Sequence, residues 1–151
     1  MSASAPDAPH VLHRLTLRVY YEDTDFSGAV YHASYLRFME RGRTNHLRLV
    51  GAGHRALFEQ ASAEAPGFAF VVRSMQIEFL KSARMDDVLE VVTAPEEVKG
   101  ASITLKQRIL RADELLVEAR VRVAFVCAGR ARPIPKALRT AMRPDQERMG
   151  G

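Results

Sequence analysis

This chain of 151 residues has a single cysteine and no long apolar run. Its one cysteine, Cys127, cannot form an internal disulfide, so a hydrophobic core must hold the fold. No stretch approaches the ~20 apolar residues that a membrane-spanning helix requires. The first dozen residues also lack the basic start and hydrophobic segment of a secretory signal. We therefore expect a cytoplasmic protein with no transmembrane segment.

Metal-binding and nucleic-acid motifs are equally scarce. No Cys–His spacing indicates a metal site, so the sequence predicts neither a metal nor a cofactor. The net charge is only +4, and no aromatic platform is interleaved with lysine and arginine. A nucleic-acid partner is therefore not expected. Cys127 ends an apolar run, which favours a buried thiol over a nucleophile.

One domain accounts for the length of the chain. A protein of 151 residues buries roughly two-thirds of its unfolded surface, which is enough for one independent core. The first residues are rich in serine, alanine and proline, and we interpret the last eight in the same way. We predict flexible tails over residues 1–12 and 144–151, and a folded domain over residues 13–143.

The first half of the domain predicts a strand, an acidic turn and a long helix. Apolar and polar side chains alternate over residues 14–21, which predicts a half-buried strand. Asp23, Asp25 and Gly28 follow in a turn. Apolar residues then recur at helical spacing until two glycines stop the pattern, so we predict a helix over residues 33–50.

A carboxylate beside a helix start is a candidate for chemistry. The first N–H groups of a helix have no partner within it, and the helix dipole is positive at that end. Such donors can stabilise an oxyanion while a carboxylate attacks a carbonyl or activates water, as acyl transfer requires. The structural alternative is that Asp23 and Asp25 only cap the helix or hold the turn. Residue types alone leave both open.

The second half of the domain predicts strands. Alternation with a period of two marks residues 75–79, 103–109 and 115–127, and residues 88–93 add a further strand. Breaks of hairpin length separate the last three strands, which predicts an antiparallel meander. A helix of about seventeen residues, ~25 Å long, can cross a five-stranded sheet and bury its apolar face. The fold class is therefore α+β.

One long motif resembles a known family. It reads YEDTDxxGxVYHAxYL over residues 21–36, and it continues as RFMERGRT over 37–44 and FLKSARMDD over 79–87. The pattern resembles the hotdog-fold acyl-CoA thioesterases of the 4-hydroxybenzoyl-CoA thioesterase family, most closely their Tol-Pal-associated YbgC branch. The resemblance spans residues 15–126 and implies a hotdog fold, a five-stranded antiparallel sheet wrapped around one long central helix.

The resemblance also implies roles for residues of the turn. Asp25 would be the catalytic carboxylate, as nucleophile or general base, while Asp23 would support the turn. The backbone N–H of His32 would face the thioester oxygen. The side chain of His32 either carries a proton to the leaving thiolate or only orients the turn.

Substrate-binding candidates lie in the turn and just after the predicted strand of residues 75–79, which resembles the second strand of the family fold. They are Gly28, Val30, Tyr31, Tyr35, Lys81 and Arg84, the last two of which could meet coenzyme A phosphates. Phe26 departs from the family pattern, and it either lines the acyl pocket or anchors the loop on the core.

Glu40 offers an alternative active carboxylate, because another hotdog subclass places its catalytic acid on the central helix. Glu40 and Arg43 are three residues apart within the apolar stripe, so the structural interpretation is an ion pair between them. The acidic turn matches the first subclass better, which favours Asp25.

The function implied is hydrolysis of acyl-CoA to a free acid and coenzyme A, with coenzyme A as part of the substrate rather than a cofactor. Family analogy implies a homodimer or homotetramer whose active sites form at the subunit interface. The alternative is a non-catalytic module that senses acyl thioesters or docks an acyl carrier protein. A carrier protein is thus a second candidate partner, and turnover distinguishes the two functions.

Overall fold

The computed structural model describes residues 12–53 and 55–143, so the predicted tails lie outside it except for residue 12. The elements in chain order are β1 (His13–Arg18), a 3₁₀ helix η2 (Tyr21–Asp23), α1 (His32–Gly53), α2 (Arg55–Glu64), β2 (Ala69–Phe79), β3 (Val88–Lys99), β4 (Ser102–Arg111), β5 (Glu114–Cys127), β6 (Arg130–Ala131) and α3 (Lys136–Ala141). Within this described part, no helix is both long and apolar enough to cross a membrane.

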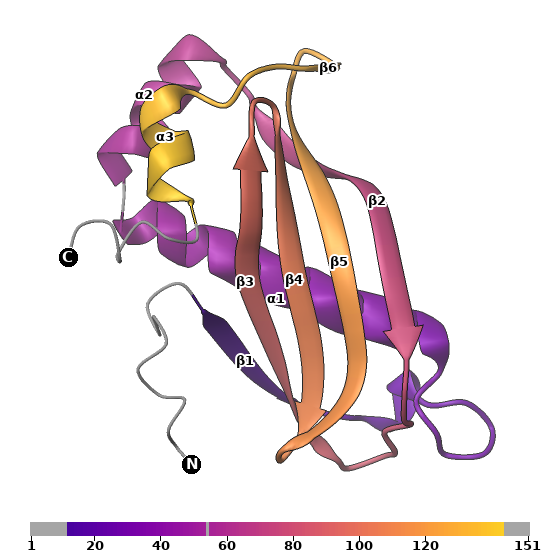
Figure 1. The fold of residues 1–151 in the computed structure, drawn as a ribbon. Helices are drawn as coiled ribbons and strands as arrows, with labels where there is room; N and C mark the ends of the chain where they lie inside the picture. The colour runs from indigo at the N-terminus through magenta and orange to yellow at the C-terminus, as the bar shows by residue number, and fades with distance from the viewer. Residues whose placement is uncertain (1–11, 54, 144–151) are drawn as a thin grey trace.

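The strands form one antiparallel sheet in the order β1-β3-β4-β5-β2, and the short β6 pairs with β5. Figure 1 shows α1 crossing behind the sheet, with α2 and α3 gathered at the far end of α1. The predicted antiparallel meander is confirmed as β3, β4 and β5. The α+β layout of one long helix on an antiparallel sheet is also confirmed: the five predicted strands form the sheet, with β1 and β2 at its edges, and the short β6 is a sixth strand that was not predicted.

A glycine brings α1 close to the sheet. A Cβ built on Gly42 would lie 2.8 Å from Val91 Cγ1 and 3.0 Å from Thr93 Oγ1. The amide of Gln107 lies in the same contact, where its Nε2 donates to Met39 O at 2.9 Å and to Thr93 Oγ1 at 2.8 Å. Gln107 and Thr93 are fully buried, so these bonds satisfy polar groups that water cannot reach. The helix and the sheet are therefore joined by a buried polar contact.

The predicted ion pair between Glu40 and Arg43 is wrong. Arg43 is buried and its Nη1 donates to Gln107 Oε1 at 3.0 Å, whereas Glu40 is exposed and accepts from Thr44 Oγ1 at 2.8 Å. The buried amide oxygen draws Arg43 toward the sheet, while Glu40 stays on the solvent side of α1.

The predicted boundaries of the first strand and the helix shift. β1 ends at Arg18, and Tyr21 is 78% exposed in η2 instead of lying on the buried face of a strand. The chain turns because Tyr20 N donates to the Asp23 carboxylate at 2.9 Å. The helix begins one residue earlier than predicted and ends three residues later, at Gly53.

Two buried histidines face each other between β1 and α1. The ring centroids of His13 and His46 are 6.1 Å apart in an edge-to-face arrangement. Burial, and then the nearby His13, lowers the pKa of His46 to about 4, and burial also lowers the pKa of His13. Among the residues described, His13 Nδ1 has no hydrogen-bond partner. Both rings are therefore neutral at neutral pH.

We expect the free energy of unfolding to fall as the pH drops from about 6.5 to about 4. An unfolded histidine takes up its proton near pH 6.5, whereas folded His46 does so near pH 4, so acid favours the unfolded state. His46 alone would contribute a loss of about 3 kcal/mol at pH 4. Urea unfolding across this range should show a shallower slope for His46→Gln than for the native protein. Equal slopes in the two proteins would contradict the prediction.

Candidate active site

A tight turn joins η2 to α1 and carries Asp25. Asp25 N donates to Ala29 O at 2.7 Å, and Gly28 N donates to Asp25 O at 3.0 Å. Gly28 has a φ of +88°, which glycine adopts without the steric cost of a Cβ. Beneath the turn, Asp23 is 6% exposed and its carboxylate accepts the N–H of Tyr20. The two acids thus differ in setting, since Asp23 is buried and Asp25 is exposed.

The two oxygens of the Asp25 carboxylate have different surroundings. Oδ1 accepts hydrogen bonds from Ser27 Oγ at 2.7 Å, from Ser27 N at 2.8 Å and from Ala29 N at 3.3 Å. These bonds, chiefly the one from the Ser27 hydroxyl, hold the pKa of Asp25 below its usual range. Oδ2 receives no hydrogen bond from residues 12–53 or 55–143. An ionised carboxylate with one free oxygen can meet water or an electrophile.

The start of α1 lies directly beside this turn. The N–H of Tyr31 donates to Asp23 O at 3.0 Å, which ties the entry of the helix to the buried acid. The N–H of His32, the first residue of α1, has no acceptor in the described part of the chain. The His32 ring packs on Tyr31 at 4.4 Å and near Phe79 at 6.3 Å between centroids. The helix therefore presents a free donor next to aromatic side chains.

Val30 and Tyr35, both predicted to bind substrate, hold the turn against the segment of residues 80–87. Val30 is 6% exposed and its N–H donates to Ala83 O at 2.9 Å. Tyr35 is 3% exposed, and its Oη accepts the N–H of Ala83 at 2.8 Å. Burial raises the pKa of Tyr35. Tyr31, by contrast, is half exposed beside His32.

Phe26 stands at the tip of the turn and is fully exposed. The interpretation that Phe26 anchors the loop on the core of its own chain is therefore wrong. The core beneath the turn is filled instead by residues such as Val19 and Ala83, both with no exposed surface. A free aromatic ring beside the carboxylate is available to line a pocket or to contact another molecule.

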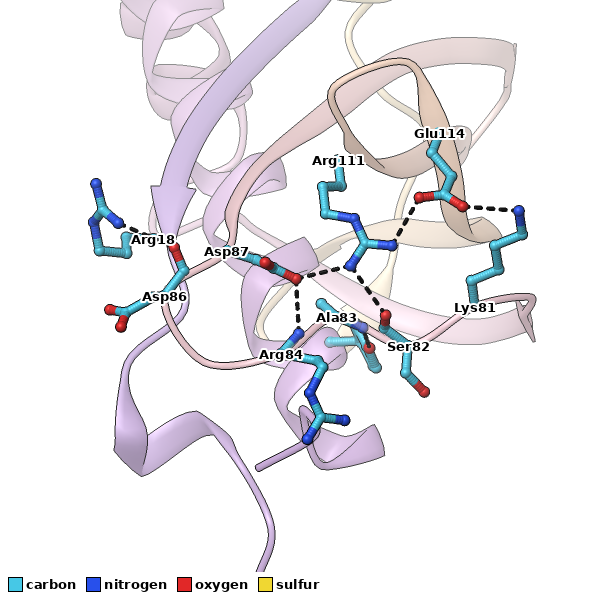
Figure 2. Close-up of polar contacts among 10 residues, drawn as sticks. Arg18, Lys81, Ser82, Ala83, Arg84, Asp86, Asp87, Arg111 and Glu114 are labelled. Carbon is cyan, nitrogen blue, oxygen red and sulfur yellow. Dashed lines mark hydrogen bonds and ion pairs between the residues drawn. The ribbon is translucent and has the colours of Figure 1, made fainter. Parts of the chain in front are cut away.

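Lys81 belongs to an ion-pair cluster at the β4–β5 hairpin, which Figure 2 shows. Lys81 Nζ lies 2.8 Å from a Glu114 carboxylate oxygen, and Arg111 Nη2 lies 2.7 Å from the other oxygen. Arg111 Nη1 also donates to Asp87 at 2.8 Å. The hydrogen bonds from Lys81 and then Arg111 lower the pKa of Glu114 to about 2. The Lys81 charge is thus already paired.

Arg84, the other predicted phosphate ligand, points toward the turn. Its Nη2 donates to Ser27 O at 2.9 Å, and an antiparallel bridge joins Arg84 to Ala29. The structure thus brings Asp25, Gly28 and Arg84 together, while Lys81 is turned to the β4–β5 hairpin.

Two groups near the site were not predicted from the sequence. Phe79, at the end of β2, is 47% exposed and its ring lies 5.7 Å from that of Tyr35. The sequence predicted that Phe79 lies in a strand but did not predict that it belongs to the site. Its place in the family motif over residues 79–87 is the signal that could have indicated this. Arg111 and Asp87 are 24 residues apart, so no local sequence pattern predicts their pairing.

A curved antiparallel sheet packed on one long helix is the architecture of the hotdog class of α+β proteins, and here a carboxylate turn lies where that helix begins. The sequence profile of the Thioesterase-like superfamily matches residues 19–142. The chain belongs to this superfamily, as the resemblance implied.

Named relatives agree with this assignment. The chain is 43% identical over 127 residues to the acyl-CoA thioesterase YbgC of Haemophilus influenzae, covering 83% of this chain and 90% of that protein. It is 46% identical over 128 residues to the acyl-CoA thioester hydrolase YbgC of Escherichia coli O157:H7, covering 84% and 90%. A crystal structure from Bartonella henselae, titled a probable thioesterase, is 37% identical with a TM-score of 0.68 and covers 83% of this chain and 99% of that one.

Proposed function

We propose that this protein hydrolyses acyl-CoA thioesters to a free acid and coenzyme A. The observation that carries the proposal is the Asp25 carboxylate, exposed and ionised, with one oxygen held by three donors and the other free. Relatives named as acyl-CoA thioesterases match most of the chain, which supports the same chemistry here.

In the proposed reaction, the thioester carbonyl lies between Asp25 and the start of α1. The carboxylate either removes a proton from water that attacks the carbonyl or attacks it directly to form an anhydride that water then opens. The N–H of His32 stabilises the oxyanion. Loss of one such donor typically lowers the rate ~10² to 10³-fold. The carbon–sulfur bond breaks, the acyl carbon gains the water hydroxyl, and the coenzyme A thiolate takes up a proton.

The pocket in this proposal combines the turn and the aromatic side chains around it. Gly28 lets the backbone approach the substrate, and Tyr31 and Phe79 offer exposed rings to the acyl group. The His32 ring, packed on Tyr31, is the group proposed to return a proton to sulfur. Hydrolysis needs only water as co-reactant, so the proposal includes no cofactor, and it keeps the cytoplasmic location expected from the sequence.

We also propose that two copies of the chain pair along β2. This edge strand is eleven residues long and carries half-exposed apolar side chains, among them Val71 and Phe79. An open edge of that kind is a template for a second strand. Phe79 and the His32 ring would then lie near the junction, which would place the two active sites at the interface.

Light scattering after size exclusion is expected to give two or four times the chain mass of 16.9 kDa. Val71→Asp, which puts a charge on the β2 edge, should shift the protein toward monomer and reduce turnover. Thr16→Asp is the matched control, because Thr16 is exposed on β1 at the other edge of the sheet. A native protein that runs at 16.9 kDa would contradict the proposed pairing.

The direct test of the function is free-thiol release from acyl-CoAs with short aliphatic, long aliphatic and aromatic acyl groups. Turnover of at least one class is expected, and the ranking of the panel identifies the substrate. Binding of acyl-CoA without thiol release across the whole panel would instead support the acyl-thioester sensor or carrier-protein module.

A further inference from the structure

Arg84 contacts the catalytic turn through its side chain and through its backbone neighbours. Its guanidinium donates to Ser27 O at 2.9 Å, and a Cβ built on Gly28 would lie 3.3 Å from the same Nη2. Met85 N donates to Gly28 O at 3.2 Å. The side chain of Arg84 therefore lies against the turn, where it would crowd any side chain added at Gly28.

The backbone of Arg84 is itself held in place. Its N–H donates to Asp87 Oδ2 at 2.8 Å, and Asp87 N donates back to Arg84 O at 3.1 Å. Arg111 binds the same Asp87 oxygen at 2.8 Å and also reaches Ser82 O at 3.3 Å, so it clasps the segment on both sides of Arg84 (Figure 2). This is a chain of charge-assisted bonds, which are the stronger kind. It runs from the β4–β5 hairpin to the turn.

Ser27 is the residue that connects Arg84 to the carboxylate. Its N–H and its hydroxyl supply the two shorter bonds to Asp25 Oδ1, and its carbonyl is the group that Arg84 holds. Fixing the carbonyl of Ser27 limits rotation of the peptide next to these donors. The positive charge of Arg84 also contributes to the lowered pKa of Asp25.

We propose that Arg84 is a positioning residue for Asp25, acting through Ser27 to hold the carboxylate in its reactive orientation. The inference rests on the proposed function, in which Asp25 is the catalytic group. It gives Arg84 a different task from that of a coenzyme A phosphate ligand, because a phosphate ligand would change substrate affinity and a positioning residue changes the catalytic step.

Steady-state kinetics of Arg84→Met test this assignment. The expected result is a fall in kcat of about 10- to 100-fold with little change in KM, since a displaced catalytic group slows the chemical step. Arg84→Lys keeps the charge and one donor and should restore part of kcat. The acid limb of the rate profile should move to higher pH in Arg84→Met, because Asp25 loses a neighbouring positive charge.

Arg18→Met is the matched control. Arg18 lies at the end of β1, and its Nη1 donates to Asp86 O at 3.0 Å, so this change removes an arginine that binds the same segment without touching Ser27. It should leave kcat within about twofold of native. A raised KM with native kcat in Arg84→Met would overturn the inference and assign Arg84 to phosphate binding, while the proposed function would stand.

A second readout is independent of turnover. Titration of the Asp25 carboxyl by carbon-13 NMR should show a higher midpoint in Arg84→Met than in the native protein, and no change in Arg18→Met. An unchanged midpoint would overturn the inference. A native protein that releases no thiol from any acyl-CoA would refute the proposed function. The titration would still show whether Arg84 affects the protonation of the Asp25 carboxyl.

Discussion

Asp25→Asn is expected to lower kcat for thiol release by at least about 10³-fold while the protein stays folded. The amide matches the carboxylate in shape but can neither take a proton from water nor attack a carbonyl. Its Oδ1 can still accept the bonds from Ser27, so the turn keeps its geometry. Because Asp25 is exposed, thermal unfolding should be close to that of the native protein.

Glu22→Gln is the control for this experiment. Glu22 is exposed in η2, three residues before Asp25, and the same chemical change there should leave kcat within about twofold of native. Glu40→Gln separates the alternative carboxylate on α1 from the one in the turn. If Asp25→Asn kept most of the activity and Glu40→Gln abolished it, the assignment of the catalytic acid would be wrong.

Gly42→Val should be the most destabilising of the substitutions considered, lowering the free energy of unfolding by at least about 3 kcal/mol. A Cβ at this position would meet Val91 Cγ1 at 2.8 Å, and Val91 is a stiff, fully buried side chain. It would also approach Gln107 Nε2 at 3.2 Å. The gain in helix propensity over glycine is below ~1 kcal/mol, so overpacking outweighs it.

Guanidinium unfolding measures this loss, with Arg41→Val as the control. Arg41 precedes Gly42 in α1 but is exposed, so the incoming valine meets no buried neighbour. Its cost should be limited to helix propensity, below ~1 kcal/mol. Equal losses in the free energy of unfolding for the two variants would mean that the close packing of α1 on the sheet at Gly42 does not contribute to stability.

The alternating strands were predictable from the sequence, whereas the two short helices were not predicted. Ile103, Leu105 and Ile109 are buried as their alternation indicates. The apolar pattern of helix α2 is weak, because the residue it buries on the face toward the core is the small Ala61. Helix α3 is only six residues long, and its buried face depends on the spacing of Ile134, Leu138 and Met142, two of which lie outside it.

One bulge shows why alternation fails locally. Ile109 pairs with Val117 but Leu110 pairs with Leu115, so Leu116 is an extra residue in β5. Leu116 is fully buried although its neighbour Val117 is buried too. Its carbonyl accepts the N–H groups of Leu80 and Lys81, 35 or more residues earlier in the chain. A contact of that range has no local sequence signature.

In the candidate site, too, the features that are local in the sequence were predictable and the contacts between distant residues were not. The sequence predicts the order of acid, glycine and helix start, because those features are local, and the structure places Asp25, Gly28 and His32 accordingly. The partners that hold the turn come from a segment more than fifty residues away, as the distance of 57 positions between Arg84 and Ser27 illustrates. Side-chain pairing across that separation depends on the finished sheet.

The span between the turn and its supports also sets an order of events during synthesis. Asp25 is made early, but Ala83 and Arg84, which hold the turn, follow much later, and Arg111, which clasps their segment, later still. Chains emerge from the ribosome N-terminus first, at about 5–20 residues per second. A nascent chain therefore carries the acidic turn for several seconds before the segment that supports it has been made, and hydrolytic competence cannot arise before β4 is complete.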